Sequence, residues 1–115
     1  MKKFSFVLLL LLSFAISAAS QTQPKLTISS TRARAYAWVH VQGTGFSVKK
    51  NVSSHLRKPD GSEYPVLPLL TNDRGEFTHD IDTLLLPVGT MELWVVDDAT
   101  QVSSNVVKFD VTTDR

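Results

Sequence analysis

Short segments in which apolar and polar residues alternate run along most of the chain, and turn-forming residues separate them. Alternation with a period of two places every second side chain on the same face of a β-strand. Beyond residue 20 the chain holds 12 valines and 11 threonines, which are stiff in helices and pack well on pleated surfaces. The pattern predicts an all-β domain of about seven short strands, at residues 25–30, 35–42, 51–58, 63–70, 76–82, 90–97 and 104–112.

Proline and glycine residues between and within these segments predict where the chain turns and which strand lies at a sheet edge. Pro59-Asp60-Gly61-Ser62 is a strong turn sequence, because proline sets the first turn angle and glycine accepts a positive φ. The following segment contains Pro65 and Pro68, which cannot donate ladder hydrogen bonds, so we expect an edge strand there. Residues 84–89 are predicted to form a crossing connection whose leucines plug the end of the core.

The first twenty residues differ from the rest of the chain. Lys2 and Lys3 precede an apolar run from Phe4 to Ile16, and small residues follow up to Ser20. This order is typical of a secretory signal peptide, and the run is shorter than a membrane span requires. We expect cleavage after Ser20 or one residue earlier, a single domain over residues 21–115, and export to the periplasm or the extracellular space with no membrane span left. The double lysine and short leucine block are typical of bacterial signal peptides.

Charge and cysteine content narrow the function classes. Beyond residue 20 the chain has ten lysines and arginines and eleven acidic residues, so its net charge is close to zero. Electrostatic attraction to nucleic acid or to an anionic membrane is therefore not expected. The chain has no cysteine, although exported domains of this size often contain disulfides. We therefore expect packing and strand pairing alone to hold the fold.

Turn motifs along the chain are similar to those of bacterial immunoglobulin-like domains. The segments that carry the likeness are VHVQGTGF (39–46), PDG (59–61), NDRGEF (72–77), PVGTM (87–91) and WVVDD (94–98). They resemble the turn motifs between the strands of IPT/TIG and filamin-type domains, although Met91 occupies a position where an aromatic residue is usual. The resemblance implies a two-sheet, Greek-key immunoglobulin-like sandwich of antiparallel strands with a non-catalytic role, such as adhesion, spacing, carbohydrate contact or assembly.

Residues that could perform catalysis or bind a metal do not converge in the predicted fold. His40 and His55 point outward from strands that such folds place in different sheets, while His79 shares the inward phase of Phe77 and Ile81. A metal ion needs three or four ligands around it. The sequence also lacks a G-x-S-x-G nucleophile motif, and we predict no catalytic residue, metal or cofactor.

The paired carboxylates have a structural interpretation. Asp97 and Asp98 begin a predicted hairpin turn, where aspartate is favoured for local hydrogen bonds. Asp80 and Asp82 share the outward phase of one strand. We interpret neither pair as an acid/base or calcium site.

Exposed aromatic residues are the most unusual feature of the sequence. If Val39 faces the core, Tyr36, Trp38 and His40 form a stripe on the outer face of their strand, and Trp94 points outward from another. Such side chains offer a large contact area at a small entropic cost. We interpret these four residues as candidate binding residues, although cross-strand pairing is an equally physical role for them.

These observations favour a non-catalytic module that binds an unknown protein, or serves an adhesive or structural role. It would act through surface complementarity, or through strand addition at the proline-bearing edge or the terminal strand. The alternative is a carbohydrate-binding module that stacks a cell-envelope glycan on Trp38 or Trp94. An enzyme is the hypothesis with the least support.

Overall fold

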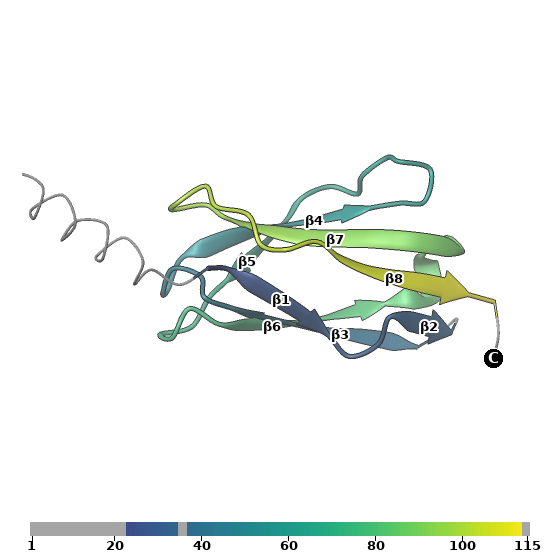
Figure 1. Cartoon of the computed structure of the whole chain (residues 1–115), viewed down its shortest axis with the longest axis horizontal. Coiled ribbons are helices and arrows are strands. Elements are labelled where there is room, and N and C mark those ends of the chain that lie inside the picture. The colour runs from purple at the N-terminus through teal and green to yellow at the C-terminus, as the bar shows by residue number, and fades with distance from the viewer. Residues whose placement is uncertain (1–22, 35–36, 114–115) are drawn as a thin grey trace, which may run out of the picture.

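The computed structural model describes residues 23–34 and 37–113, which form two packed β-sheets (Figure 1). The predicted signal peptide and Tyr36 lie outside the described residues. One sheet has the order β1-β3-β6 and consists of Lys25–Ile28, Trp38–Thr44 and Phe77–Asp82. The other has the order β2-β8-β7-β4-β5 and consists of Arg32–Arg34, Val107–Thr112, Gly89–Asp97, Asn51–Arg57 and Leu67–Leu70. A short 3-10 helix, η1, spans Thr83–Leu85. No helix in the described part of the chain is long and apolar enough to cross a membrane.

The strand order is that of an immunoglobulin-like sandwich. β3 lies between β1 and β6 in one sheet, whereas β4, β7 and β8 are neighbours in the opposite sheet, as the Greek-key connections of this fold require. The predicted all-β, two-sheet class is therefore confirmed. The described residues contain eight strands, one more than the expected seven. The additional strand, β2, runs parallel to β8, so the strands are not all antiparallel.

Alternation positions the core as predicted. Val39 and Val41 of β3 are buried, and Met91, Leu93 and Val95 of β7 face them from the other sheet. Further buried apolar side chains close the space between the sheets, namely Leu26, Ala33, Phe46, Val52, Phe77, Ile81, Phe109 and Val111. Removing these surfaces from water is the main source of stability in a domain without disulfides.

The connection before β7 differs from its prediction. Leu84 and Leu85 are 50% and 87% exposed, and of the three leucines only Leu86 packs against the core. The Asp82 carboxylate accepts the Leu84 N–H and starts η1 there. This tight turn holds Leu84 and Leu85 away from the core, so the prediction that the leucines plug the core was wrong for both.

The last predicted strand is shorter than expected. The segment 104–112 joins the ladder only from Val107. Ser104 and Asn105 lie before it, and their side chains bond to Val95 and Leu26. The predicted strand bounds of 104–112 were therefore wrong for residues 104–106.

The edges of the two sheets are not equivalent. β5, with Pro68, pairs with β4 alone, which confirms the predicted proline-bearing edge. β8 lies between β7 and β2. The hypothesis of strand addition at the terminal strand is therefore wrong for the described chain, because β2 already occupies that edge.

Candidate functional site

The outer face of the three-stranded sheet carries two of the predicted aromatic-stripe residues. Trp38 is 54% exposed and lies opposite Asp82 of β6. His40 Nδ1 lies 2.6 Å from Asp80 Oδ1. The predicted outward orientation of Trp38 and His40 is confirmed, and His40 forms a cross-strand pair with Asp80. Their role in binding stays a prediction.

A polar hollow lies beside His40 on this face. It encloses about 350 Å³, and its polar lining residues are Thr27, Ser29, His40, Gln42, Thr78 and Asp80. These side chains come from all three strands of the sheet and offer both donors and acceptors. The hollow could hydrogen-bond a polar ligand, with the Trp38 ring two residues from His40 along β3.

Trp94 lies on the opposite sheet and packs against its neighbours. Its ring stacks on His55 with centroids 5.1 Å apart and 5° between the planes, and the Arg57 guanidinium carbon lies 4.9 Å from the ring centroid. Arg57 Nη1 in turn lies 3.3 Å from Glu92 Oε1. The structure therefore separates Trp94 from Trp38 and His40, and cross-strand packing engages the Trp94 ring.

The histidines are distributed as the sequence predicted. His40 is on β3, His55 is on β4 of the other sheet, and His79 is half-buried on β6. Burial lowers the pKa of His79, although the nearby Asp80 carboxylate opposes that shift. Within residues 23–34 and 37–113 no group of three or more His, Cys, Asp or Glu side chains is placed to hold a metal ion.

One side of the sandwich is closed by an asparagine. Asn105 Oδ1 accepts the Leu26 N–H at 2.8 Å, and its Nδ2 donates to the Leu26 carbonyl at 3.2 Å. These bonds satisfy the outer backbone groups of β1 at its centre and link the two sheets. On the same side β2 covers the edge of β8. We call this region, comprising β1, β2, β8 and Asn105, the closed side.

The opposite side of the sandwich is open. β6 ends one sheet and β5 ends the other. Between them lies a groove of about 310 Å³. The groove is lined by Ser54, Leu56, Tyr64, Pro65, Leu67, His79, Ile81 and Leu93. We call β5, β6 and this groove the open side, because in the described part of the chain no strand pairs with the outer edge of either strand.

Asp97 fixes the end of the sandwich rather than a reactive site. Its carboxylate accepts the Ser47 N–H and hydroxyl, both at 2.8 Å, and the Ala99 N–H at 3.0 Å. Burial alone would raise the pKa of Asp97, but the hydrogen bonds from Ser47, Ala99 and the Thr100 backbone outweigh burial and lower that pKa. Local bonding at the turn was predicted, and the long-range bond to Ser47 was not.

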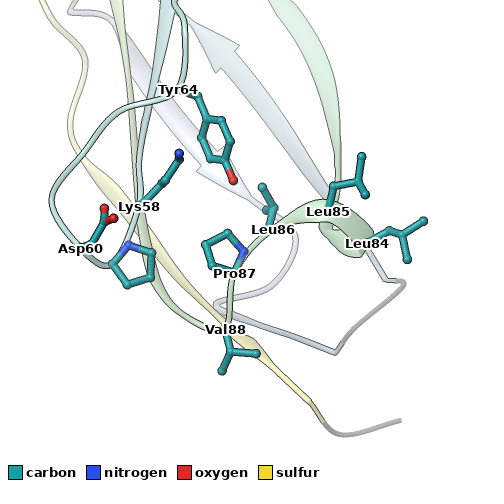
Figure 2. Close-up of a pocket in the computed structure, with 9 residues that line it drawn as sticks. Lys58, Asp60, Tyr64, Leu84, Leu85, Leu86, Pro87 and Val88 are labelled. Atoms are coloured by element: carbon teal, nitrogen blue, oxygen red, sulfur yellow. The ribbon is translucent and has the colours of Figure 1, made fainter.

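A second hollow lies at the end of the molecule near η1. It is open, encloses about 760 Å³ and lies between the turn that contains Asp60 and residues 84–88. Tyr64, Leu84, Leu85 and Leu86 all line it, and Figure 2 shows Leu84 and Leu85 pointing away from Tyr64. The Lys58 ammonium lies 4.5 Å from the Tyr64 ring centroid. The walls of this hollow combine the apolar residues of the 84–88 segment with Lys58, Asp60 and Tyr64.

Sequence reasoning missed Asn105 and the open edge of β6. Asn105 shares the inward phase of Val107 and Phe109, and a polar residue in an apolar phase signals a specific hydrogen-bond partner. The β6 edge has no comparable signal, because alternation identifies which face of a strand is buried but not which strands are neighbours.

Comparison with known proteins finds similarity to solved structures but no match by sequence. No protein-family model and no curated protein matches the sequence. Among solved structures it is similar to the CARDB domain of a Pyrococcus furiosus protein in complex with di-metal ions, at 10% identity and a TM-score of 0.47, covering 80% of this chain and 93% of that one. It is also similar to the PKD domain of an M14-like peptidase from a Thermoplasmatales archaeon, at 16% identity and a TM-score of 0.41, covering 81% and 94%. The fold assignment itself rests on the strand order.

Proposed function

We propose that this chain is a non-catalytic, exported interaction module that binds a partner protein at its open side. The observation that carries the proposal is the unequal treatment of the sheet edges. Asn105 and β2 occupy the edges of the closed side, whereas β6 borders an apolar groove with its outer edge unpaired among the described residues. Exposed strand edges pair readily with extended chains, so an edge that the fold leaves open is a natural binding surface.

The export part of the proposal comes from the sequence. Lys2 and Lys3, the apolar run that ends at Ile16 and the small residues up to Ser20 support a signal peptide. The turn motifs described above support kinship with IPT/TIG or filamin-type domains and an adhesive or structural role. The lack of a nucleophile motif supports a function other than catalysis.

Site-specific photo-crosslinking in the host tests this proposal. A photoreactive amino acid at Thr78, exposed on β6, should give one discrete crosslinked protein. The matched control places it at Lys108, which is exposed on β8 of the other sheet. Crosslinking at neither position, or equally at both, would contradict binding at the open side.

Carbohydrate binding is the second candidate, and a specific observation favours it. Trp38 is exposed two residues from His40, which lines the polar hollow, and sugar binding commonly combines an aromatic face with hydrogen-bonding groups. The Trp94→Phe variant leaves Trp38 as the one tryptophan, so its fluorescence can be titrated with cell-wall polysaccharides. An unchanged spectrum, and equal retention of wild type and Trp38→Ala on a polysaccharide column, would rule this candidate out.

A further inference from the structure

The backbone of β6 uses only some of its hydrogen-bonding groups within its sheet. The Ser29 N–H donates to the His40 carbonyl, so the backbone groups of His40 point toward β1. Because backbone direction alternates along an antiparallel strand, those of Val41 point toward β6, where Val41 pairs with His79. The backbone groups of His79 therefore bond within the sheet.

The neighbouring residues of β6 have the opposite direction. By the same alternation, the backbone N–H and C=O of Thr78 and Asp80 point away from β3, toward the outer edge. In residues 23–34 and 37–113 no strand pairs with that edge. Two residues with outward backbone groups are enough to begin a new antiparallel ladder.

The groove would receive every second side chain of an added strand. Side chains of β6 alternate between the groove, where His79 and Ile81 lie, and the exposed outer face, where Thr78 and Asp80 lie. A strand added beside β6 would alternate in the same way. Its inward side chains would meet apolar walls that include Leu56 of the other sheet, so they should be apolar.

The outer face of β6 favours one charge in the added strand, and it disfavours pairing with a second copy of this chain in the register that places the two Asp80 residues opposite each other. Asp80 and Asp82 are both exposed there, with Asp80 paired to His40 and Asp82 accepting the Leu84 N–H. In an antiparallel pairing of two β6 edges centred on Asp80, the two Asp80 carboxylates would lie directly opposite each other, and like charges in that position destabilise a sheet. Lysine or arginine at the outward positions of a partner would instead be attracted.

We propose that the β6 edge binds an extended segment of a partner protein in which apolar residues alternate with lysine or arginine. The apolar side chains enter the groove, and the basic ones lie beside Asp80 and Asp82. This inference rests on the proposed function and specifies the chemistry of the partner.

Fluorescence anisotropy with synthetic peptides tests the pattern. The probe is a labelled peptide of about seven residues that alternates valine and lysine. The controls are a valine–glutamate alternation and a peptide of the probe's composition with its valines grouped together. We expect the probe to bind at least about tenfold more tightly than either control. Equal binding of all three peptides, or no binding of the probe, would overturn the inference.

Two variants locate the binding on β6. Thr78→Pro removes an outward-facing N–H and no bond to β3, so it should weaken the probe about tenfold while circular dichroism and the melting temperature remain close to wild type. Asp80→Lys should reverse the preference toward the valine–glutamate peptide. Asp98→Lys, in the exposed turn after β7, makes the same charge change away from the edge and should leave the preference unchanged. Probe binding that is unaffected by Thr78→Pro and Asp80→Lys would overturn the assignment to β6.

The remaining outcomes separate this inference from the proposed function. A discrete crosslink at Thr78 in the host, together with no binding of the valine–lysine probe, would overturn the partner chemistry and leave the interaction module standing. A dimer in solution that dissociates in the Thr78→Pro variant would show that a second copy occupies the edge, and would overturn the inference.

Discussion

The two sides of this sandwich differ in how the backbone groups at their sheet edges are paired. On the closed side, Asn105 bonds both backbone groups of Leu26, and β2 pairs with β8. On the open side, β5 and β6 border a groove that reaches His79 and Leu93. A sheet edge left unpaired invites association, so under the proposed function the closed side stabilises the fold and the open side binds the partner.

The largest expected effect compares one apolar side chain from each side. Phe109 of β8 is 1% exposed, whereas Leu67 of β5 is 42% exposed. Phe109→Ala should lower the free energy of unfolding by about 3 to 5 kcal/mol, and Leu67→Ala should lower it by less than about 1 kcal/mol. Urea denaturation of both variants measures the contrast. Similar losses in the two variants would show that the open side is packed as tightly as the closed side.

The hydrogen-bonded carboxylate of Asp97 should make the free energy of unfolding depend on pH in the acid range. Its folded-state pKa lies below the ordinary value of 3.8, so its stabilising effect is complete above that value and is lost as the pH falls through the lower folded-state pKa. Asp97→Asn should lower the free energy of unfolding at neutral pH by about 1 to 3 kcal/mol, and should flatten its decline below about pH 4. An unchanged acid profile in denaturation experiments would show that the Ser47 bonds do not stabilise the fold.

The Asn105→Ala variant tests whether the hydrogen bonds between Asn105 and Leu26 stabilise the closed side. Asn105→Ala leaves the outer backbone groups of Leu26 without their partner, which should cost about 1 to 2 kcal/mol in thermal or chemical unfolding. Asn51→Ala, at an exposed position on β4, serves as the control and should change stability by less than about 0.5 kcal/mol. Equal free energies of unfolding for the two variants would mean that water replaces the hydrogen bonds between Asn105 and Leu26 without loss of stability.

His79 gives the smallest effect and reports on the open side. Burial lowers its pKa below the ordinary 6.5, so the unfolded chain binds a proton at higher pH than the folded chain does. Stability should therefore fall slightly as the pH falls below about 6.5. His79→Gln should remove that decline. A decline that persists in the variant would assign it to another group.

The local pattern of this fold could be predicted from the sequence, and the order of its strands could not. Alternation identified the buried faces around Val39 and Ile81, and Pro68 identified the edge at β5. The segment that forms β2 escaped notice because in Arg32-Ala33-Arg34 only Ala33 is buried, and its partner β8 is far along the chain. Leu84 and Leu85 were misplaced because the cap from Asp82 depends on a turn geometry that hydrophobicity does not encode.

The candidate site shows the same division. The outward orientations of Trp38, His40 and Trp94 follow from alternation. That Trp94 packs against His55, and that Trp38 lies on the opposite face of the domain, depends on sheet order. The open edge of β6 depends on sheet order as well.

Residue-resolved amide hydrogen exchange by NMR tests the open edge of β6 most directly. The outward N–H groups of Thr78 and Asp80 should exchange rapidly, while those of His79 and Ile81, bonded to β3, should be protected. Leu26 provides the comparison on the closed side, because its N–H donates to Asn105 and should exchange slowly. Protection of Thr78 and Asp80 equal to that of His79 in the isolated chain would show that the edge is already occupied, and would contradict this account.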